Sequence, residues 1–197
     1  MRHTLRLALG SFVLLVSSMA LAQTGGADYY PLKTGTKWVY KVLETTITVK
    51  VASADAEGAK LEIEVNGKAV ASEVIKVTPE GIVRTKINNA KIEPPVMILK
   101  LKDGKATKGE KWAIASTIAD QKVKGEFSVK DDKEKIKTNL GDLEAVAVEG
   151  TEFDIAGTKT SVKYWFVAGK GIVKLMYNIQ NNEAVLELKE FTEAPPK

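Results

Sequence analysis

The stretch Leu61-Glu62-Ile63-Glu64-Val65-Asn66-Gly67 alternates apolar and charged side chains and then ends in an Asn-Gly pair. Successive side chains of a β-strand point to opposite faces, so this alternation predicts a strand with one face in a core and one in water. Asn-Gly accepts the positive φ angles of a type I′ turn, which joins two antiparallel strands directly. The stretch therefore predicts a β-hairpin.

The same alternation recurs along most of the chain, in residues 46–51, 122–130 and 185–190. Turn signals separate such runs at short spacing, among them Glu57-Gly58, Asp103-Gly104, Gly169-Lys170-Gly171 and Asn181-Asn182. Residues 69–76 have the composition of a short helix, but a strand is favoured there because they follow the Asn-Gly turn. We therefore predict an all-β protein with little helix. Its architecture is a single antiparallel meander of about eleven strands, forming a strongly curved sheet or an open half-barrel.

The apolar phase changes once, near Gly150. Val146 and Val148 occupy even positions, whereas Phe153 and Ile155 occupy odd ones. Because the side-chain period of a strand is two, the change must be absorbed by an extra residue. The sequence therefore predicts a β-bulge at Gly150.

The segment Pro94-Pro95-Val96-Met97-Ile98-Leu99 is the least polar one after the N-terminal region. Its two prolines argue against a central strand, because proline has no N–H for the sheet ladder. The favoured interpretation is a strand buried on both faces or a core plug. The alternative is the apolar lip of a ligand cavity, with methionine as adaptable lining. The candidate ligand-binding residues are Val96, Met97, Ile98, Leu99, Trp112 and Trp165.

Residues 1–22 have the pattern of a secretory signal peptide. Arg2 and Arg6 precede the apolar run 7–16, and Ala20-Leu21-Ala22 supplies the small residues for cleavage between Ala22 and Gln23. The apolar run is shorter than the roughly 20 residues of a membrane-spanning helix. We expect a signal peptide over 1–22, a single β domain over 23–192 and a frayed tail over 193–197.

Composition excludes several chemistries. The chain has 197 residues, no cysteine and one histidine, His3, which lies in the expected signal peptide. Removing 22 of the 197 residues leaves 175, with 27 basic against 25 acidic residues and a net charge of +2. A chain without His or Cys cannot form a thiol enzyme, a Ser-His-Asp hydrolase or a typical zinc site. The near-neutral charge argues against nucleic acid, and with Arg84 as the remaining arginine an anion site is not expected.

Two pairs of carboxylates could support acid–base chemistry. Glu62 with Glu64, and Glu152 with Asp154, are spaced so that each pair shares one face of a strand, as in a retaining glycosidase. Both pairs lie on the polar phase of their strands, which favours a solvated surface. The run Asp131-Asp132-Lys133-Glu134-Lys135 is rich in oxygen ligands, but its lysines favour a charged hairpin turn over a cation site.

Four sequence motifs resemble those of a family of exported bacterial β-sheet proteins of unknown function. These are Tyr29-Tyr30-Pro31-Leu32 with Gly35, Trp38 and Tyr40; Asp103-Gly104 followed by Gly109-Glu110-Lys111-Trp112; the segment 137–146; and the block 164–174, which begins Tyr-Trp-Phe-Val-Ala-Gly-Lys-Gly. In the third motif, 137–146, Leu140 and Leu143 replace the small and aromatic residues of the family. The resemblance implies export and an antiparallel sheet. It also implies a distant similarity in shape to the half-barrel carriers of periplasmic lipoproteins, which hold acyl chains on a concave sheet.

We expect an exported binding module, periplasmic or extracellular, that performs no chemistry and needs no cofactor or metal. Its partner would be a hydrophobic small molecule or a lipid-modified or other envelope protein, held on the curved sheet. The alternative is a structural module of the cell envelope with a filled core. A carboxylate-pair hydrolase is the third hypothesis. Lining and core residues have the same composition, so the sequence leaves open whether the concave face is empty.

Overall fold

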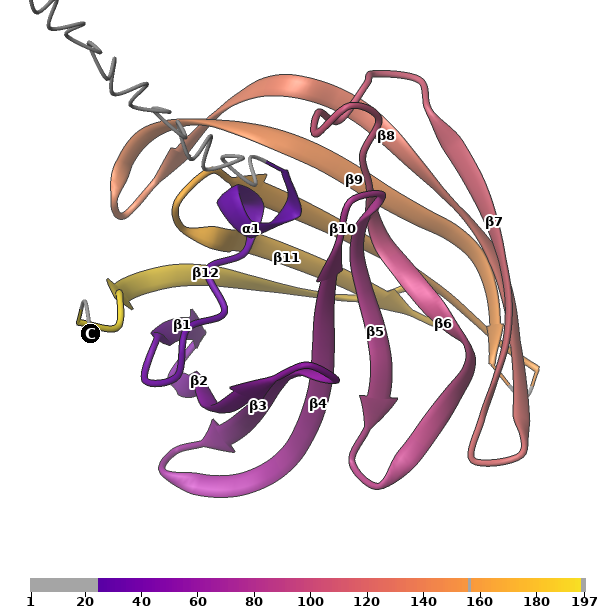
Figure 1. Cartoon of the computed structure of the whole chain (residues 1–197), viewed down its shortest axis with the longest axis horizontal. Helices are drawn as coiled ribbons and strands as arrows, with labels where there is room; N and C mark the ends of the chain where they lie inside the picture. Colours follow the sequence, from indigo (N-terminus) through magenta and orange to yellow (C-terminus); the bar gives the residue numbers. More distant parts are fainter. Residues whose placement is uncertain (1–24, 156, 196–197) are drawn as a thin grey trace, which may run out of the picture.

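The computed structural model describes residues 25–155 and 157–195, so the expected signal peptide and its cleavage site Ala22–Gln23 lie outside the described residues. Twelve strands form one antiparallel meander that closes into a barrel (Figure 1). Each strand pairs with the next, and the last pairs with the first. The strands are β1 (Lys37–Val42), β2 (Thr45–Asp55), β3 (Gly58–Val65), β4 (Lys68–Thr78), β5 (Gly81–Ile87), β6 (Ala90–Lys100), β7 (Lys111–Ile118), β8 (Gln121–Thr138), β9 (Gly141–Ile155), β10 (Thr158–Val167), β11 (Gly171–Ile179) and β12 (Asn182–Thr192), preceded by the short helix α1 (Gly26–Tyr29).

The predicted all-β antiparallel meander is confirmed, with twelve strands where about eleven were expected. The curved sheet completes a full turn instead of stopping as a half-barrel. Closure comes from β1 and β12, which pair from Lys37 with Thr192 to Lys41 with Glu187. The predicted Asn-Gly turn is also present, because Asn66 and Gly67 both have positive φ, at 49° and 79°. Closure pairs β1 with β12, which would otherwise be the two edge strands of the sheet.

The two ends of the barrel differ. At one end, called the plug end here, the β4–β5 and β10–β11 turns meet the short helix α1 (Figure 1). At the opposite end, called the mouth end, the chain reverses in the tight turns 88–89, 119–120 and 180–181. Asn88, Asp120 and Asn181 adopt positive φ there, which short polar side chains tolerate better than branched ones do.

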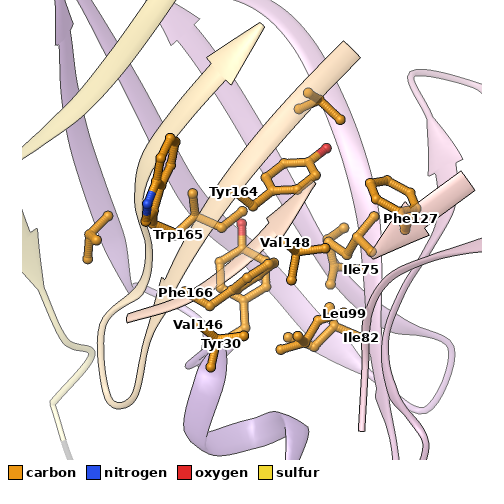
Figure 2. Close-up of a cluster of buried hydrophobic side chains, with 14 of the residues drawn as sticks. Tyr30, Ile75, Ile82, Leu99, Phe127, Val146, Val148, Tyr164, Trp165 and Phe166 are labelled. Carbon is orange, nitrogen blue, oxygen red and sulfur yellow. The ribbon is translucent and has the colours of Figure 1, made fainter. Parts of the chain in front are cut away.

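Aromatic side chains fill the plug end. The ring of Tyr30 lies 5.3 Å from Trp38 and 6.5 Å, edge-on, from Phe166, and all three are buried. Figure 2 shows the contact between Tyr30 and Phe166. The Trp38 indole N–H donates to the carbonyl of Lys170 at 2.6 Å, in the β10–β11 turn. Gly171 leaves the space that Tyr30 uses, since a Cβ there would lie 2.8 Å from the tyrosine ring. The sequence motif that contains Tyr30 and Trp38 is therefore in contact with the motif at 164–174.

The double proline lies inside β6, between β5 and β7, so the prediction that it excludes a central strand was wrong. The ladder shows why these two residues are tolerated. The pairing of β6 with β5 skips from Lys91 to Val96, and its pairing with β7 covers only Ile92 and Glu93. Neither proline therefore stands at a position where a backbone N–H would pair with a neighbouring strand. The Trp112 indole instead bridges the gap between β7 and β6 by donating to the Met97 carbonyl at 2.9 Å.

Two further expectations need correction. The run 131–135 lies within β8 instead of forming a hairpin turn, at a point where the β8–β9 register shifts. Two acids of the run pair with lysines from other segments, Asp131 with Lys108 at 2.8 Å and Glu134 with Lys163 at 3.3 Å, so the run contributes ion pairs between segments. The tail begins packed instead of frayed, because Ala194 is buried and its backbone N–H donates to Thr36 Oγ1 at 3.4 Å.

We predict that Trp38→Phe lowers the free energy of unfolding by about 1 kcal/mol, because the partly buried Lys170 carbonyl loses its donor. Urea denaturation measures the change. Tyr29→Phe is the matched control, since Tyr29 is only half-buried beside the same cluster; we expect it to stay within about 0.5 kcal/mol of the parent protein. A Trp38→Phe protein as stable as the control would show that this contact does not hold the plug end.

Candidate functional site

The mouth half of the barrel contains a cavity of about 470 Å³. Exposed Ala119, Gln121 and Ile179 are among its lining residues, so it opens to solvent at the mouth end. The buried aromatic side chains of Tyr30, Trp38 and Phe166, called the plug here, close its other end. Strands β5 to β11 supply the walls, which are Arg84, Ile87, Ile92, Val96, Ile114, Ile118, Ala119, Gln121, Val123, Phe127, Phe153, Thr160, Ser161, Val162, Tyr164, Tyr177 and Ile179. This volume and this mostly apolar wall are typical of small-molecule sites.

Two glycines and a β-bulge shape one wall of the cavity. The β9–β10 register shifts between the pairs Phe153–Thr160 and Gly150–Val162, which places the bulge next to Gly150 as the sequence predicted. The bulge turns the Phe153 ring over Gly150 and Gly125, where a Cβ would lie 2.4 Å and 2.3 Å from the ring. Phe153 then meets Phe127 edge-on at 5.1 Å. The phase change in the sequence thus directs an aromatic ring into the cavity wall.

The inner end of the cavity is polar. Arg84 Nε lies 2.6 Å from Glu73 Oε2, and their side chains are only 19% and 14% exposed. Although the carboxylate is close enough for an ion pair, it lies off the N–H direction. Among the described residues, Arg84 Nε is therefore the one buried side-chain nitrogen or oxygen without a hydrogen-bond partner. Arg84 lines the cavity, whereas Glu73 is not among the lining residues.

Tyrosines surround this ion pair. Tyr164 and Tyr177 line the cavity, and the buried Tyr40 donates its hydroxyl hydrogen to the Ile172 carbonyl at 2.7 Å. Burial by itself would lower the pKa of Arg84, but the charge of Glu73 outweighs it and the pKa is raised, so the guanidinium stays charged. Burial, with a smaller contribution from Glu73, raises the pKa of Tyr40 and holds the phenol neutral.

The structure places one of the six candidate ligand-binding residues, Val96, in the cavity wall. Ile98 and Leu99 are fully buried, and Leu99 packs in the core beside Ile82 near the plug (Figure 2). Met97 and Trp112 form the bridge between β6 and β7, where Trp112 also stacks on Phe127 at 5.6 Å. The apolar run therefore serves mainly as core, which was the favoured interpretation.

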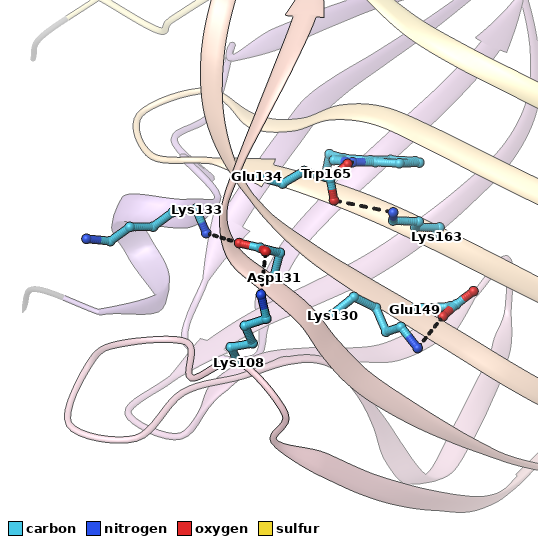
Figure 3. A network of polar contacts seen from close by, with 8 residues as sticks. All are labelled: Lys108, Lys130, Asp131, Lys133, Glu134, Glu149, Lys163 and Trp165. Carbon is cyan, nitrogen blue, oxygen red and sulfur yellow. Dashed lines mark hydrogen bonds and ion pairs between the residues drawn. The ribbon is translucent and has the colours of Figure 1, made fainter.

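Trp165 lies on the outer face of its strand, away from the cavity. Figure 2 shows it on the opposite side of β10 from Tyr164 and Phe166. Its indole N–H donates to Glu134 at 3.0 Å, and Lys163 lies 4.5 Å above its ring. These contacts belong to the charged outer surface of β8 and β10, shown in Figure 3.

Neither carboxylate pair forms a buried acid–base site. Glu62 and Glu64 both bind Lys50 on the outside of the barrel, at 3.3 Å and 3.0 Å. Glu152 and Asp154 are exposed, and neither lines the cavity. Asp154 instead accepts the backbone N–H of Gly157 at 2.8 Å.

Sequence reasoning missed the polar end of the cavity. It treated Arg84 as evidence against an anion site and did not consider Glu73. A usable signal was present, because Arg84 follows Ile82 by two residues and so occupies the apolar, inward phase of β5. An arginine at an inward position is rarely found without a partner or a role.

Comparison with known proteins bears on the fold. No protein-family model matches the chain, and no curated protein matches it in sequence. A candidate exported protein with a YmcC-like fold from Bacteroides fragilis has a TM-score of 0.51 at 14% identity, covering 83% of this chain and 98% of its own. A candidate lipoprotein from Parabacteroides distasonis has a TM-score of 0.48 at 14% identity, with coverages of 83% and 98%. The hypothetical lipoprotein YmcC from Escherichia coli has a TM-score of 0.40 at 10% identity, with coverages of 87% and 91%.

The chain shares the YmcC-like fold, as its similarity to the Bacteroides fragilis protein shows. At this identity the similarity concerns the fold alone. Within the described part of the chain, no helix is long and apolar enough to cross a membrane. Residues 25–155 and 157–195 also contain no cluster of three or more acidic, His or Cys side chains that could hold a metal ion.

We predict that Tyr40→Phe flattens the loss of stability above pH 10. The folded chain keeps the Tyr40 proton while the unfolded chain releases it near pH 10.0, so the free energy of unfolding falls as pH rises further. One such group contributes about 1.4 kcal/mol per pH unit. Urea denaturation at a series of alkaline pH values measures this slope. Trp112→Phe, which removes no titratable group, should keep the parent slope. Parallel curves for Tyr40→Phe and the parent protein would contradict the burial of this phenol.

Proposed function

We propose that this protein is an exported binding protein that holds one small hydrophobic molecule inside its barrel and performs no chemistry on it. The observation that carries the proposal is the cavity of about 470 Å³, open at the mouth end and closed at the plug end. Apolar side chains lining an open hollow gain free energy when a ligand replaces the water beside them, by about 25 cal/mol per Å² of apolar surface removed from water. A filled structural core has no use for such a hollow.

Export is part of the proposal. It is supported by the signal-peptide pattern of residues 1–22, and the similar fold of the Bacteroides fragilis protein, itself described as a candidate exported protein, agrees with it. Binding without chemistry is supported by the charged groups at the inner end of the cavity. Arg84 and Glu73 are paired with each other, which leaves neither as a free acid or base.

A purely structural role is the weaker candidate. The filled plug end fits it, because Tyr30, Trp38 and Phe166 leave no space there. The mouth half does not fit it, because a barrel that needed only stability would gain from closing over its own apolar wall. Binding accounts for both halves, since the plug supplies a closed inner end for the cavity.

We predict that the protein binds N-phenyl-naphthylamine, an uncharged probe that fluoresces in apolar surroundings, with one molecule per chain. Val162→Phe should weaken this binding by at least about tenfold, because the larger side chain occupies the cavity. Fluorescence titration measures the affinity. Val70→Phe, the same substitution at a position that is 57% exposed, is the control and should bind like the parent protein.

No saturable binding by the parent protein would contradict the proposed function. Equal binding by the Val162→Phe and parent proteins, with both folded by circular dichroism, would place the probe outside the cavity and contradict it as well.

A further inference from the structure

We infer that the cavity selects a ligand with an uncharged polar head that accepts hydrogen bonds, such as an ester or amide carbonyl on a hydrocarbon chain. The inference rests on the proposed function and names the ligand class. It comes from the arrangement of the Arg84–Glu73 pair at the inner end of an otherwise apolar hollow.

The inner end presents hydrogen-bond donors to the cavity. A guanidinium carries five N–H groups and no acceptor. Glu73 lies on one side of Arg84 and is not itself among the cavity-lining residues. Arg84 Nε has no aligned acceptor, and Tyr164 and Tyr177, whose hydroxyls can donate, line the same cavity. A ligand atom at this end would therefore meet donors, and it must accept hydrogen bonds to replace water there.

The charge of the site favours an uncharged acceptor over a carboxylate. Glu73, 2.6 Å from Arg84, already compensates the guanidinium charge. A ligand carboxylate would add a second negative charge in buried surroundings, where an uncompensated ion is costly. An ester or amide carbonyl accepts the same N–H groups without that penalty.

The orientation of the ligand follows from the same arrangement. The head lies at the inner end against Arg84, and the hydrocarbon chain runs along the apolar walls toward the mouth. There the lining becomes polar again, through Gln121, Thr160 and Ser161, beside half-exposed Ile179. A single-chain amphiphile fits this order of donor-rich end, apolar wall and open polar rim.

The test compares methyl decanoate with decanoate at neutral pH, as competitors of N-phenyl-naphthylamine. The parent protein should bind the ester at least about tenfold more tightly than the ionised acid. Glu73→Gln removes the compensating charge and leaves Arg84 positive. In this variant the affinity for decanoate, relative to the affinity for the ester, should rise at least about tenfold. The preference for the ester should therefore narrow or reverse.

Glu62→Gln is the matched control, because it removes a carboxylate that pairs with Lys50 on the outside of the barrel. It should leave the parent preference unchanged. A second variant guards against misfolding of Glu73→Gln. Combined Glu73→Leu and Arg84→Met replaces the buried pair by apolar residues, which proteins often tolerate without loss of stability. It should bind the uncharged probe normally but bind methyl decanoate about tenfold more weakly than the parent does.

The outcomes separate the two proposals. If the parent binds the probe but prefers decanoate, or if neither variant at Glu73 changes the affinities of ester and acid, the head-group inference is overturned and the proposed function stands. If neither the probe nor the two decanoyl compounds bind the parent protein, the proposed function fails and the inference fails with it.

Discussion

The contact on which the rest of this structure depends is the one between the N-terminal segment and the β10–β11 turn. Trp38 donates its indole hydrogen to the Lys170 carbonyl, and Tyr30 packs into the space that Gly171 leaves free. An eight-stranded barrel is about the size that its own side chains can fill, and larger barrels enclose space. A barrel of twelve strands therefore has more interior than it needs for a core. The aromatic plug fills one half of that interior, and the other half remains hollow.

The Arg84–Glu73 pair lies where the two halves meet. Its cost in desolvation would be hard to explain in a barrel made only for stability, because apolar residues of similar volume often stabilise a core as well or better. Here the pair faces the hollow through Arg84 and is backed by Tyr40 and the plug. Its position gives the cavity a chemically distinct inner end, and this asymmetry is what would orient a ligand in the proposed binding site.

Much of the fold could be predicted because its signals are local. Alternation in 61–65, the Asn66-Gly67 turn and the phase change near Gly150 each depend on a few neighbouring residues. Closure could not be predicted, since it depends on β1 pairing with β12 across the whole length of the domain. Pro94 and Pro95 were misjudged for a related reason. Whether a proline breaks a ladder depends on the neighbouring strands, and both neighbours leave those positions unpaired.

The site was less predictable than the fold. Val96 lines the cavity while Ile98 and Leu99 fill the core, although the three have the same chemistry and stand within four residues. Nothing in composition separates a side chain that faces a hollow from one that faces another side chain. Glu73 and Arg84 come from different strands, and their pairing depends on the β4–β5 register, which includes a shift beside Ile75. Only the inward phase of Arg84 gave a local indication of its role.

The central claim is that the mouth half of the barrel is an apolar hollow. Apolar cavities bind xenon, so a crystal structure of the protein under xenon pressure tests the claim most directly. The account predicts xenon density between Val96, Phe127 and Val162, with Arg84 at the inner end still paired with Glu73. A mouth half filled by inward rotation of its own side chains, with no xenon bound, would contradict it.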